Sequence, residues 1–175
     1  IEATYATAGV QRFAIWSHSS TPHVAKQLTA GGYLPDEVTY VMAMDLDTIT
    51  TPDGPELDLV EPDFNEFLRI NGLSPMFNSL PATADAAVYV ARVEDHHAAA
   101  LMSYEHEGDC GIFNVATLDF ARRRGLGTKL TAHALERARE RGCTTASLQS
   151  TEMGQSIYEK VGFQHIGAYT EYVQS

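Results

Sequence analysis

Apolar and polar residues follow each other along the chain in patterns that predict alternating strands and helices. Period-two or continuous apolar runs predict strands at 11–16, 39–46, 56–60, 86–93, 98–105, 111–118, 144–149 and 166–173. Helical spacing between capping and stop residues predicts helices at 22–30, 62–71, 74–80, 126–141 and 154–161. The strands 86–93 and 98–105 form a hairpin around 94–97, and 111–118 joins the same sheet. A chain of 175 residues is expected to form about one domain.

The first fifty residues stand apart in this pattern. They predict a β-α-β extension, and two prolines and a glycine within 50–55 mark a linker to the remaining residues, 51–175. The order Ser-Thr, helix, Gly-aromatic occurs twice with equal spacing, from Ser20 to Tyr33 and from Ser150 to Phe163. Two interpretations stay open. Short β-α-β units converge on such residues, or the extension is a degenerate half-domain left by a duplication.

Composition narrows the classes of partner and compartment. The formal net charge of −11 argues against nucleic acid or an anionic membrane as the main partner. No apolar stretch approaches the roughly 18 residues of a membrane span, and the opening residues do not resemble a signal peptide. The two cysteines lack metal-ligand spacing and fit a reducing compartment. A cytoplasmic protein is therefore expected.

Basic residues gather in one segment of this acidic chain. The segment 111–142 predicts a strand, a turn with Arg122, Gly125 and Gly127, and a long amphipathic helix. Such a turn presents free backbone N–H groups at the positive end of a helix dipole, and glycines let a phosphate approach closely. The spacing of a nucleotide P-loop is absent, and Leu130 stands where a dinucleotide motif has its third glycine. The segment therefore indicates a polyphosphate site, with a solvated charge run as the alternative.

The residues in these segments resemble those of a known family. Arg/Gln-x-x-Gly-x-Gly/Ala between a strand and a long helix is the acetyl-CoA pyrophosphate motif of the GNAT superfamily of N-acetyltransferases. The segment 148–169, LQSTEMGQSIYEKVGFQHIGAY, is similar to that family's closing strand-helix-strand, with Tyr158 followed by Gly162 and Phe163. The resemblance covers 56–173 well. It implies an α/β fold with a mixed, mostly antiparallel sheet and helices on both faces, preceded by the β-α-β extension.

The resemblance also implies where acetyl-CoA binds. Backbone at Val115 and Thr117 would pair with the pantetheine arm, the glycine-rich turn would hold the pyrophosphate, and a hydroxyl would replace the asparagine that many members have near the pantetheine. The cofactor-binding residues expected on this basis are Val115, Thr117, Arg122, Arg123, Arg124, Gly125, Gly127, Thr128 and Thr151. No metal site is expected, because His96, His97 and His106 are most simply polar residues of turns.

The implied reaction is direct attack of a primary amine on the thioester, with a small molecule or a protein lysine as acceptor. Tyr158 resembles the family's general acid, although an aromatic flanked by apolar residues could also be a packing residue. A backbone N–H near Val115 would bind the oxyanion. Gly111 stands where several members place a basic glutamate, which leaves Asp109, Glu105 or a chain of waters to accept the proton.

Two further questions stay open in the sequence. The missing carboxylate at Gly111 keeps a second function in view, that of a non-catalytic acyl-CoA-binding sensor or scaffold. A homodimer is compatible with everything above.

Overall fold

The computed structural model describes residues 2–10, 12–79 and 84–174. Thirteen helices and strands follow one another along these residues, joined in four places by short 3₁₀ turns. Their bounds are α1 Glu2–Thr7, β1 Ala14–His18, α2 Pro22–Ala30, β2 Tyr33–Asp45, β3 Asp58–Leu59, α3 Phe64–Asn71, β4 Ala86–Val93, β5 His96–His106, β6 Asp109–Thr117, α4 Leu126–Glu140, β7 Thr145–Ser150, α5 Gln155–Glu159 and β8 Gln164–Gln174.

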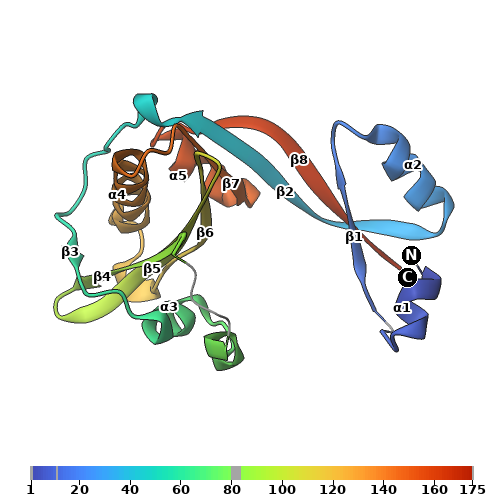
Figure 1. Cartoon of the computed structure of the whole chain (residues 1–175), viewed down its shortest axis with the longest axis horizontal. Coiled ribbons are helices and arrows are strands. Elements are labelled where there is room, and N and C mark those ends of the chain that lie inside the picture. The colour runs from blue at the N-terminus through green and yellow to red at the C-terminus, as the bar shows by residue number, and fades with distance from the viewer. Residues whose placement is uncertain (1, 11, 80–83, 175) are drawn as a thin grey trace.

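The strands form one sheet in the order β1-β8-β2-β7-β6-β5-β4-β3. Each pair is antiparallel except β6 with β7, which run parallel. Helix α4 packs on one face of the sheet and α3 on the other (Figure 1). The predicted fold, a mixed and mostly antiparallel sheet with helices on both faces, is therefore confirmed.

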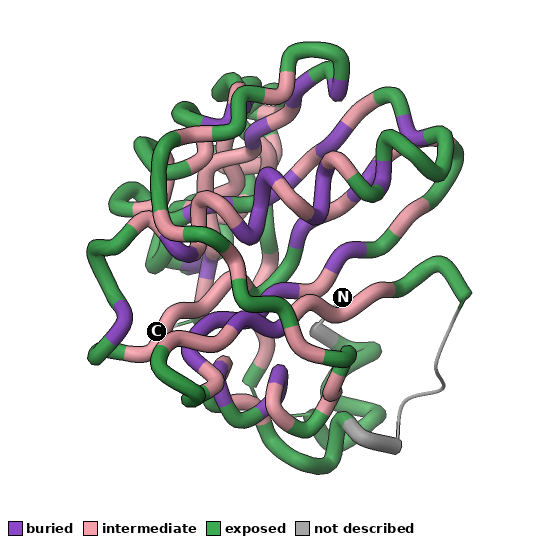
Figure 2. The backbone as a smooth tube through the Cα atoms, turned by 90° about the vertical axis from the view of Figure 1, so that its left-hand side faces the viewer, coloured by how far each residue is buried: buried purple, intermediate pink, exposed green. Residues whose placement is uncertain are grey.

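Helix α4 anchors the larger of two apolar clusters. Leu126, Leu130, Ala134, Leu135 and Ala138 recur with helical spacing, and all are buried against the sheet. Buried positions alternate with less buried ones along β7, whereas residues 98–101 of β5 are all buried because helices cover both faces of the sheet there; Figure 2 colours the backbone by burial. Burying a leucine of this kind contributes about 1.5–3 kcal/mol. The helix therefore fixes the position of its own N-terminus relative to β6 and β7.

Several boundaries differ from those predicted. The turn between β4 and β5 has two residues, Glu94 and Asp95, both with positive φ (51° and 63°), so that β5 begins at His96 rather than at 98. A two-residue turn of this kind matches the twist of the paired strands. The opening strand is Ala14–His18 rather than 11–16. In the region predicted helical at 74–80, a 3₁₀ turn spans Pro75–Ser79, while Leu80 lies outside the described residues.

Strand β2 lies inside the sheet, not at its edge. It was predicted at 39–46 and spans Tyr33–Asp45, because it pairs with β8 between Tyr33 and Ala43 and with β7 from Tyr40 to Asp45. Met42 and Met44 are buried there in the cluster beneath α4. The linker 50–55 then crosses α4, where the Thr51 hydroxyl donates to Glu136 Oε1 at 2.7 Å. The division at residue 50 stays a prediction.

Deletion of residues 1–50 tests whether the extension is a separate unit. We expect the remaining chain to aggregate, because β7 would lose one neighbouring strand and β8 would lose both of its neighbours, and the exposed edges would pair between molecules. Size-exclusion chromatography and urea denaturation measure the outcome. A soluble 51–175 chain with a cooperative transition would instead mark residues 1–50 as an independent module.

Candidate active site

The candidate site begins where the two parallel strands separate. Strands β6 and β7 pair from Asp109 with Thr145 to Ile112 with Leu148, and no further pair is recorded between the described residues of these strands. At this point β6 contains a bulge. Asn114 has φ 50°, and the register with β5 shifts between the partners of Ala100 and Met102. The remaining backbone of β6 has no partner on β7 among the described residues, and we call this gap in the pairing the slot.

The bulge also changes the face on which side chains lie. Val115 packs against the cluster beneath α4, as Ile112 does, although the two are three residues apart. A Cβ placed on Gly127 would lie 3.3 Å from Thr117 Oγ1 and 3.8 Å from Val115 Cγ1. Glycine at 127 therefore lets the first turn of α4 approach the end of β6. The structure thus brings together Val115, Thr117 and Gly127 as predicted.

The turn before α4 has the conformation that a glycine permits. Gly125 is the N-cap residue with φ 78°, in the left-handed region, and no side chain caps the helix among the described residues. The N–H groups of the first turn, which includes Gly127 and Thr128, therefore lack a capping partner from a side chain. The linker lies beside Gly125: a Cβ placed on this glycine would be 3.7 Å from the Asp53 carbonyl oxygen and 3.9 Å from Gly54 Cα. The end of α4 nearest the slot is a site for an anion.

The three arginines of the turn differ in their contacts. Arg122 donates through Nε to the carbonyl oxygen of Thr117 at 2.9 Å and lies 2.8 Å from Asp119 Oδ1, so it ties the turn to the end of β6. Arg124 lies 3.8 Å from Glu94, and its side chain is about half exposed. Arg123 is exposed and has φ 61°. Exposed ion pairs of this kind contribute little to stability, which leaves the guanidinium groups available to an anion.

Tyr158 belongs to α5 and lies close to the end of β7, across the slot from β6. A Cβ on Gly154 would stand 2.6 Å from Ser150 Oγ, 3.4 Å from the Tyr158 ring and 3.5 Å from Thr151 Oγ1, so these residues form one group. The Tyr158 ring packs edge-on against Phe163, with centroids 6.0 Å apart. Burial raises the pKa of the Tyr158 phenol, which keeps it protonated at neutral pH. Such a group can donate a proton.

Two members of this group were missed by the sequence analysis. Ser150 is 4% exposed, and its hydroxyl donates to the Thr151 carbonyl oxygen at 2.8 Å. Gly154 leaves the space that this hydroxyl occupies. Gly154, three residues after Thr151 and at the start of the predicted helix 154–161, was the available signal, because a glycine at such a point indicates a close approach.

Phe113 accounts for the absence of a carboxylate at position 111. A Cβ on Gly111 would lie 2.7 Å and 3.0 Å from two atoms of the Phe113 ring, which covers the glycine on the face opposite α4. A glutamate at this position would therefore require the ring to move. The ring is 47% exposed and forms part of the surface beside the slot.

The two carboxylates considered as proton acceptors have different surroundings. Glu105 is bound by the guanidinium of Arg141, which also approaches the Tyr89 hydroxyl. Asp109 accepts hydrogen bonds from the hydroxyls of Thr145 and Ser147, each at 2.7 Å. Ser147 is the register partner of Gly111 and lies next to the slot. Asp109 is therefore connected to the slot through a hydroxyl, whereas Glu105 is held by an arginine.

The remaining reactive residue types lie in separate surroundings. Cys110 and Cys143 are buried free thiols, and burial raises the pKa of Cys110 to about 12. His97 Nδ1 lies 2.8 Å from Glu66 Oε2, and His96 Nδ1 lies 2.7 Å from the Glu94 carbonyl oxygen. No group of three His, Cys, Asp or Glu side chains suited to a metal occurs in the described part of the chain. Within the same part, no helix is long and apolar enough to cross a membrane.

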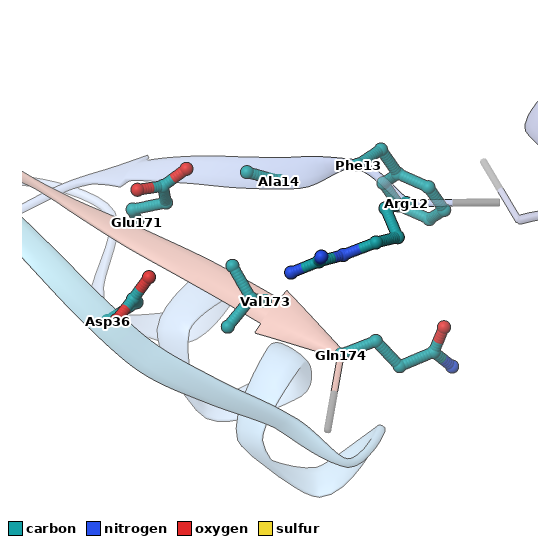
Figure 3. A pocket seen from close by; sticks show the side chains of 7 residues that line it. All are labelled: Arg12, Phe13, Ala14, Asp36, Glu171, Val173 and Gln174. Atoms are coloured by element: carbon teal, nitrogen blue, oxygen red, sulfur yellow. The ribbon is translucent and has the colours of Figure 1, made fainter. Parts of the chain in front are cut away.

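A hollow of about 660 Å³ lies far from the slot, over β1, β2 and β8 (Figure 3). Arg12 projects across it between Asp36 on β2 and Glu171 on β8. It contains no residue of the turn before α4 and none of the group around Tyr158. The slot is the better candidate for the active site, because the end of strand pairing, an uncapped helix start and a partly buried phenol come together there.

Comparison with known proteins places this site in a class. A sequence model of the acetyltransferase (GNAT) family matches residues 53–163, which include β6, the turn, α4 and Tyr158. The fold is that of an acyltransferase domain of this family. The chain belongs to the GNAT family of acetyltransferases. No curated protein matches it in sequence.

Solved structures extend the likeness to the whole chain. A GCN5-related N-acetyltransferase from Kribbella flavida is 21% identical with a TM-score of 0.81, over 99% of this chain and 72% of that one. One from Sphaerobacter thermophilus is 18% identical with a TM-score of 0.70, over 93% and 60%. A tandem GNAT protein from the clavulanic acid biosynthesis pathway is 15% identical with a TM-score of 0.69, over 97% and 66%. The chain thus spans roughly two thirds of these proteins.

Proposed function

We propose that this chain transfers the acetyl group of acetyl-CoA to a primary amine, carried by a small molecule or a protein lysine. The observation that supports the proposal most directly is the slot between β6 and β7, with the uncapped end of α4 beside one strand and the partly buried phenol of Tyr158 beside the other. An anion-binding helix end and a proton donor across a strand gap suit a thioester that carries a pyrophosphate.

Each residue of the slot has a role in this proposal. The backbone of β6 at Val115 and Thr117, beyond the end of its pairing with β7, binds the pantetheine arm as an added strand. The turn binds the pyrophosphate through backbone N–H groups and guanidinium groups, and Thr151 supplies a hydroxyl. The proposed cofactor-binding residues are Val115, Thr117, Arg122, Arg123, Arg124, Gly125, Gly127, Thr128 and Thr151.

Two groups of the chain stabilise the reaction in this scheme. A backbone N–H near Val115, on the bulged part of β6, donates to the oxyanion that forms when the amine attacks the carbonyl carbon. As the C–S bond breaks, the Tyr158 phenol donates its proton to the departing sulfur. Burial raises the pKa of this phenol, so the proton is present at neutral pH.

We infer that Asp109 accepts the proton of the amine, through the Ser147 hydroxyl and water. The carboxylate lies on the face opposite α4, and Phe113 fills the place where a nearer carboxylate would stand. Glu105 is disfavoured because Arg141 holds it.

The absence of a carboxylate at Gly111 is also the observation that favours the second candidate, a non-catalytic acyl-CoA-binding sensor. Release of free CoA in the presence of a panel of amines, followed with a thiol reagent, separates the two. Binding without release for every amine would favour the sensor.

Gly125→Val tests the phosphate turn, and Gly72→Val is its matched control. Both glycines have left-handed backbone, φ 78° and 63°, so each valine is expected to cost about 1–3 kcal/mol of stability. Gly72 ends α3, far from the slot. We expect only Gly125→Val to weaken CoA binding, measured by calorimetry, because it strains the turn that presents the N–H groups of α4 and places a side chain against the linker at Asp53 and Gly54. Equal CoA affinity in both variants would contradict the assignment of the turn.

Tyr158→Phe tests the proton donor while keeping the ring that packs on Phe163. We expect kcat to fall roughly 10²–10⁴-fold with little change in the KM for acetyl-CoA, because the proton is needed only in the transition state. Single-turnover rates exclude masking by product release. The control is Tyr169→Phe, which removes a phenol that faces His18 on β1. A raised KM with unchanged kcat would make Tyr158 a binding residue instead.

Asp109→Asn tests the proton acceptor. The hydroxyls of Thr145 and Ser147 donate to different oxygens of the carboxylate, and the amide keeps an acceptor oxygen for one of them. We expect kcat/KM to fall by about 10²-fold at neutral pH, with the deficit narrowing as pH rises, because solvent base then replaces the carboxylate. Glu107→Gln, an exposed carboxylate in the neighbouring turn, serves as control. A pH profile parallel to that of the unchanged chain would exclude Asp109.

A further inference from the structure

The four strands β1, β8, β2 and β7 are related by an internal two-fold arrangement. Two β-α-β units, β1-α2-β2 and β7-α5-β8, exchange their last strands, so that β2 pairs with β7 and β8 pairs with β1. An offset of 130 residues maps β2 onto β8. The pair Thr39–Tyr169 then maps onto itself, Val38–Thr170 maps onto Tyr40–Ala168, and the bulge in each strand maps onto the bulge in the other. The similarity found from Ser20 and from Ser150 therefore has a counterpart in the pairing.

The same symmetry defines which residues of β1 and β7 correspond. Leu148 pairs with Met42, and Ile15 pairs with Tyr172, the equivalent of Met42. Ile15 thus takes the place of Leu148, and Ser17, 5% exposed, takes the place of Ser150, 4% exposed. The segment from Ser17 to Tyr33 is three residues longer than the segment from Ser150 to Phe163, so the structural equivalent of Ser150 is not Ser20.

The outer edges of the two equivalent strands differ. That of β7 is occupied by β6, in parallel, from Thr145 to Leu148. The outer edge of β1 has no neighbouring strand in the part of the chain that the structure describes. The Ser19 N–H donates to Ala168 on β8, and the alternation of an antiparallel ladder then directs the backbone groups of Ala14 and Trp16 outward. Trp16 is 43% exposed there.

The helix before β1 also corresponds to the helix before β7. Helix α1 precedes β1 as α4 precedes β7, and Tyr5 of α1 stacks on Phe13 with centroids 4.3 Å apart. Residues 3–7 of α1 are otherwise exposed. The hollow in Figure 3 lies over β1, β8 and β2, and Arg12 points into it. The order helix, strand, helix, strand is thus repeated, but without the strand that corresponds to β6.

From this symmetry we infer that the outer edge of β1 is the docking site for a parallel strand of a second acetyltransferase-type half-sheet. That strand would lie beside β1 as β6 lies beside β7. The symmetry maps Thr145–Leu148 onto Arg12–Ile15, so a carboxylate at the position of Asp109 would lie beside Arg12. A second copy of this chain does not supply the strand, because its own β6 is paired with β5 and β7. Leu28 occupies the position of Tyr158, so the second half lacks the phenol.

A peptide with the sequence of β6, residues 109–117 with Cys110→Ser, is the probe. The full chain, labelled with ¹⁵N, is titrated with millimolar peptide and observed by NMR. We expect the amide signals of Ala14 and Trp16 to shift more than those of Ile15 and Ser17. A spin label on the peptide N-terminus should broaden Arg12 more than His18, as parallel pairing requires.

Ala14→Pro removes the N–H of residue 14, which faces outward, and leaves the hydrogen bonds between β1 and β8 in place. Ala14→Val is the matched control, because it keeps this N–H. We expect roughly five- to tenfold weaker peptide binding for the proline variant only. A peptide N-methylated at alternate residues tests the same ladder should the proline variant not fold.

Three results would overturn the inference. They are no shift at Ala14 and Trp16, antiparallel broadening, and shifts of these amides with protein concentration alone, which would mean self-pairing of β1. CoA binding to the same sample is measured separately. The inference rests on strand symmetry, so failure of CoA binding would refute the proposed function and leave this one standing.

Discussion

The site depends on the point where two parallel strands stop pairing. The bulge at Asn114 turns the rest of β6 away from β7, and hydrogen-bonding groups that a continuous sheet would satisfy are left open to a ligand. The same bulge brings Val115 and Thr117 over the start of α4, where Gly127 leaves room for them. Burial of one face of α4 holds its N-terminus at this opening. A local irregularity in one strand therefore creates both the slot and its contact with the anion-binding helix end.

The sequence predicted those parts of the fold that local patterns determine. Helix α4 was predicted within a residue of its observed end, because its apolar stripe, preceding glycines and Gly142 act within one segment. The exchange of β2 and β8 was not predicted, because strand partners far apart in the chain leave no mark in periodicity. The bulge at Asn114 was missed for a related reason. It is visible only as a register shift against β5, and an asparagine with φ 50° is not distinguishable from one in a regular strand.

The site was predicted unevenly for the same physical reason. The turn before α4 is local, so Arg122, Gly125 and Gly127 were found together and the structure brings them to one place. Ser150 and Gly154 make contacts that depend on how β7 meets α5. The contact between Gly111 and Phe113 could not be predicted from the sequence. Residues that are two apart on a strand share a face, but only the orientation of the Phe113 ring decides which space it fills. The carboxylate that the sequence lacks at position 111 would therefore stand where the structure places the Phe113 ring.

The exchanged strand connects the extension to the chemistry of the slot. Tyr40 of β2 is the register partner of Ser150, and Ser150 contacts the turn that precedes the Tyr158 helix. Residues from the first fifty positions thus support the end of β7 from its other edge, while β6 leaves it on the side of the slot. A strand with one edge open to a ligand keeps its position only if the other edge is held. The support that β2 gives to β7 is the counterpart of the opening between β7 and β6.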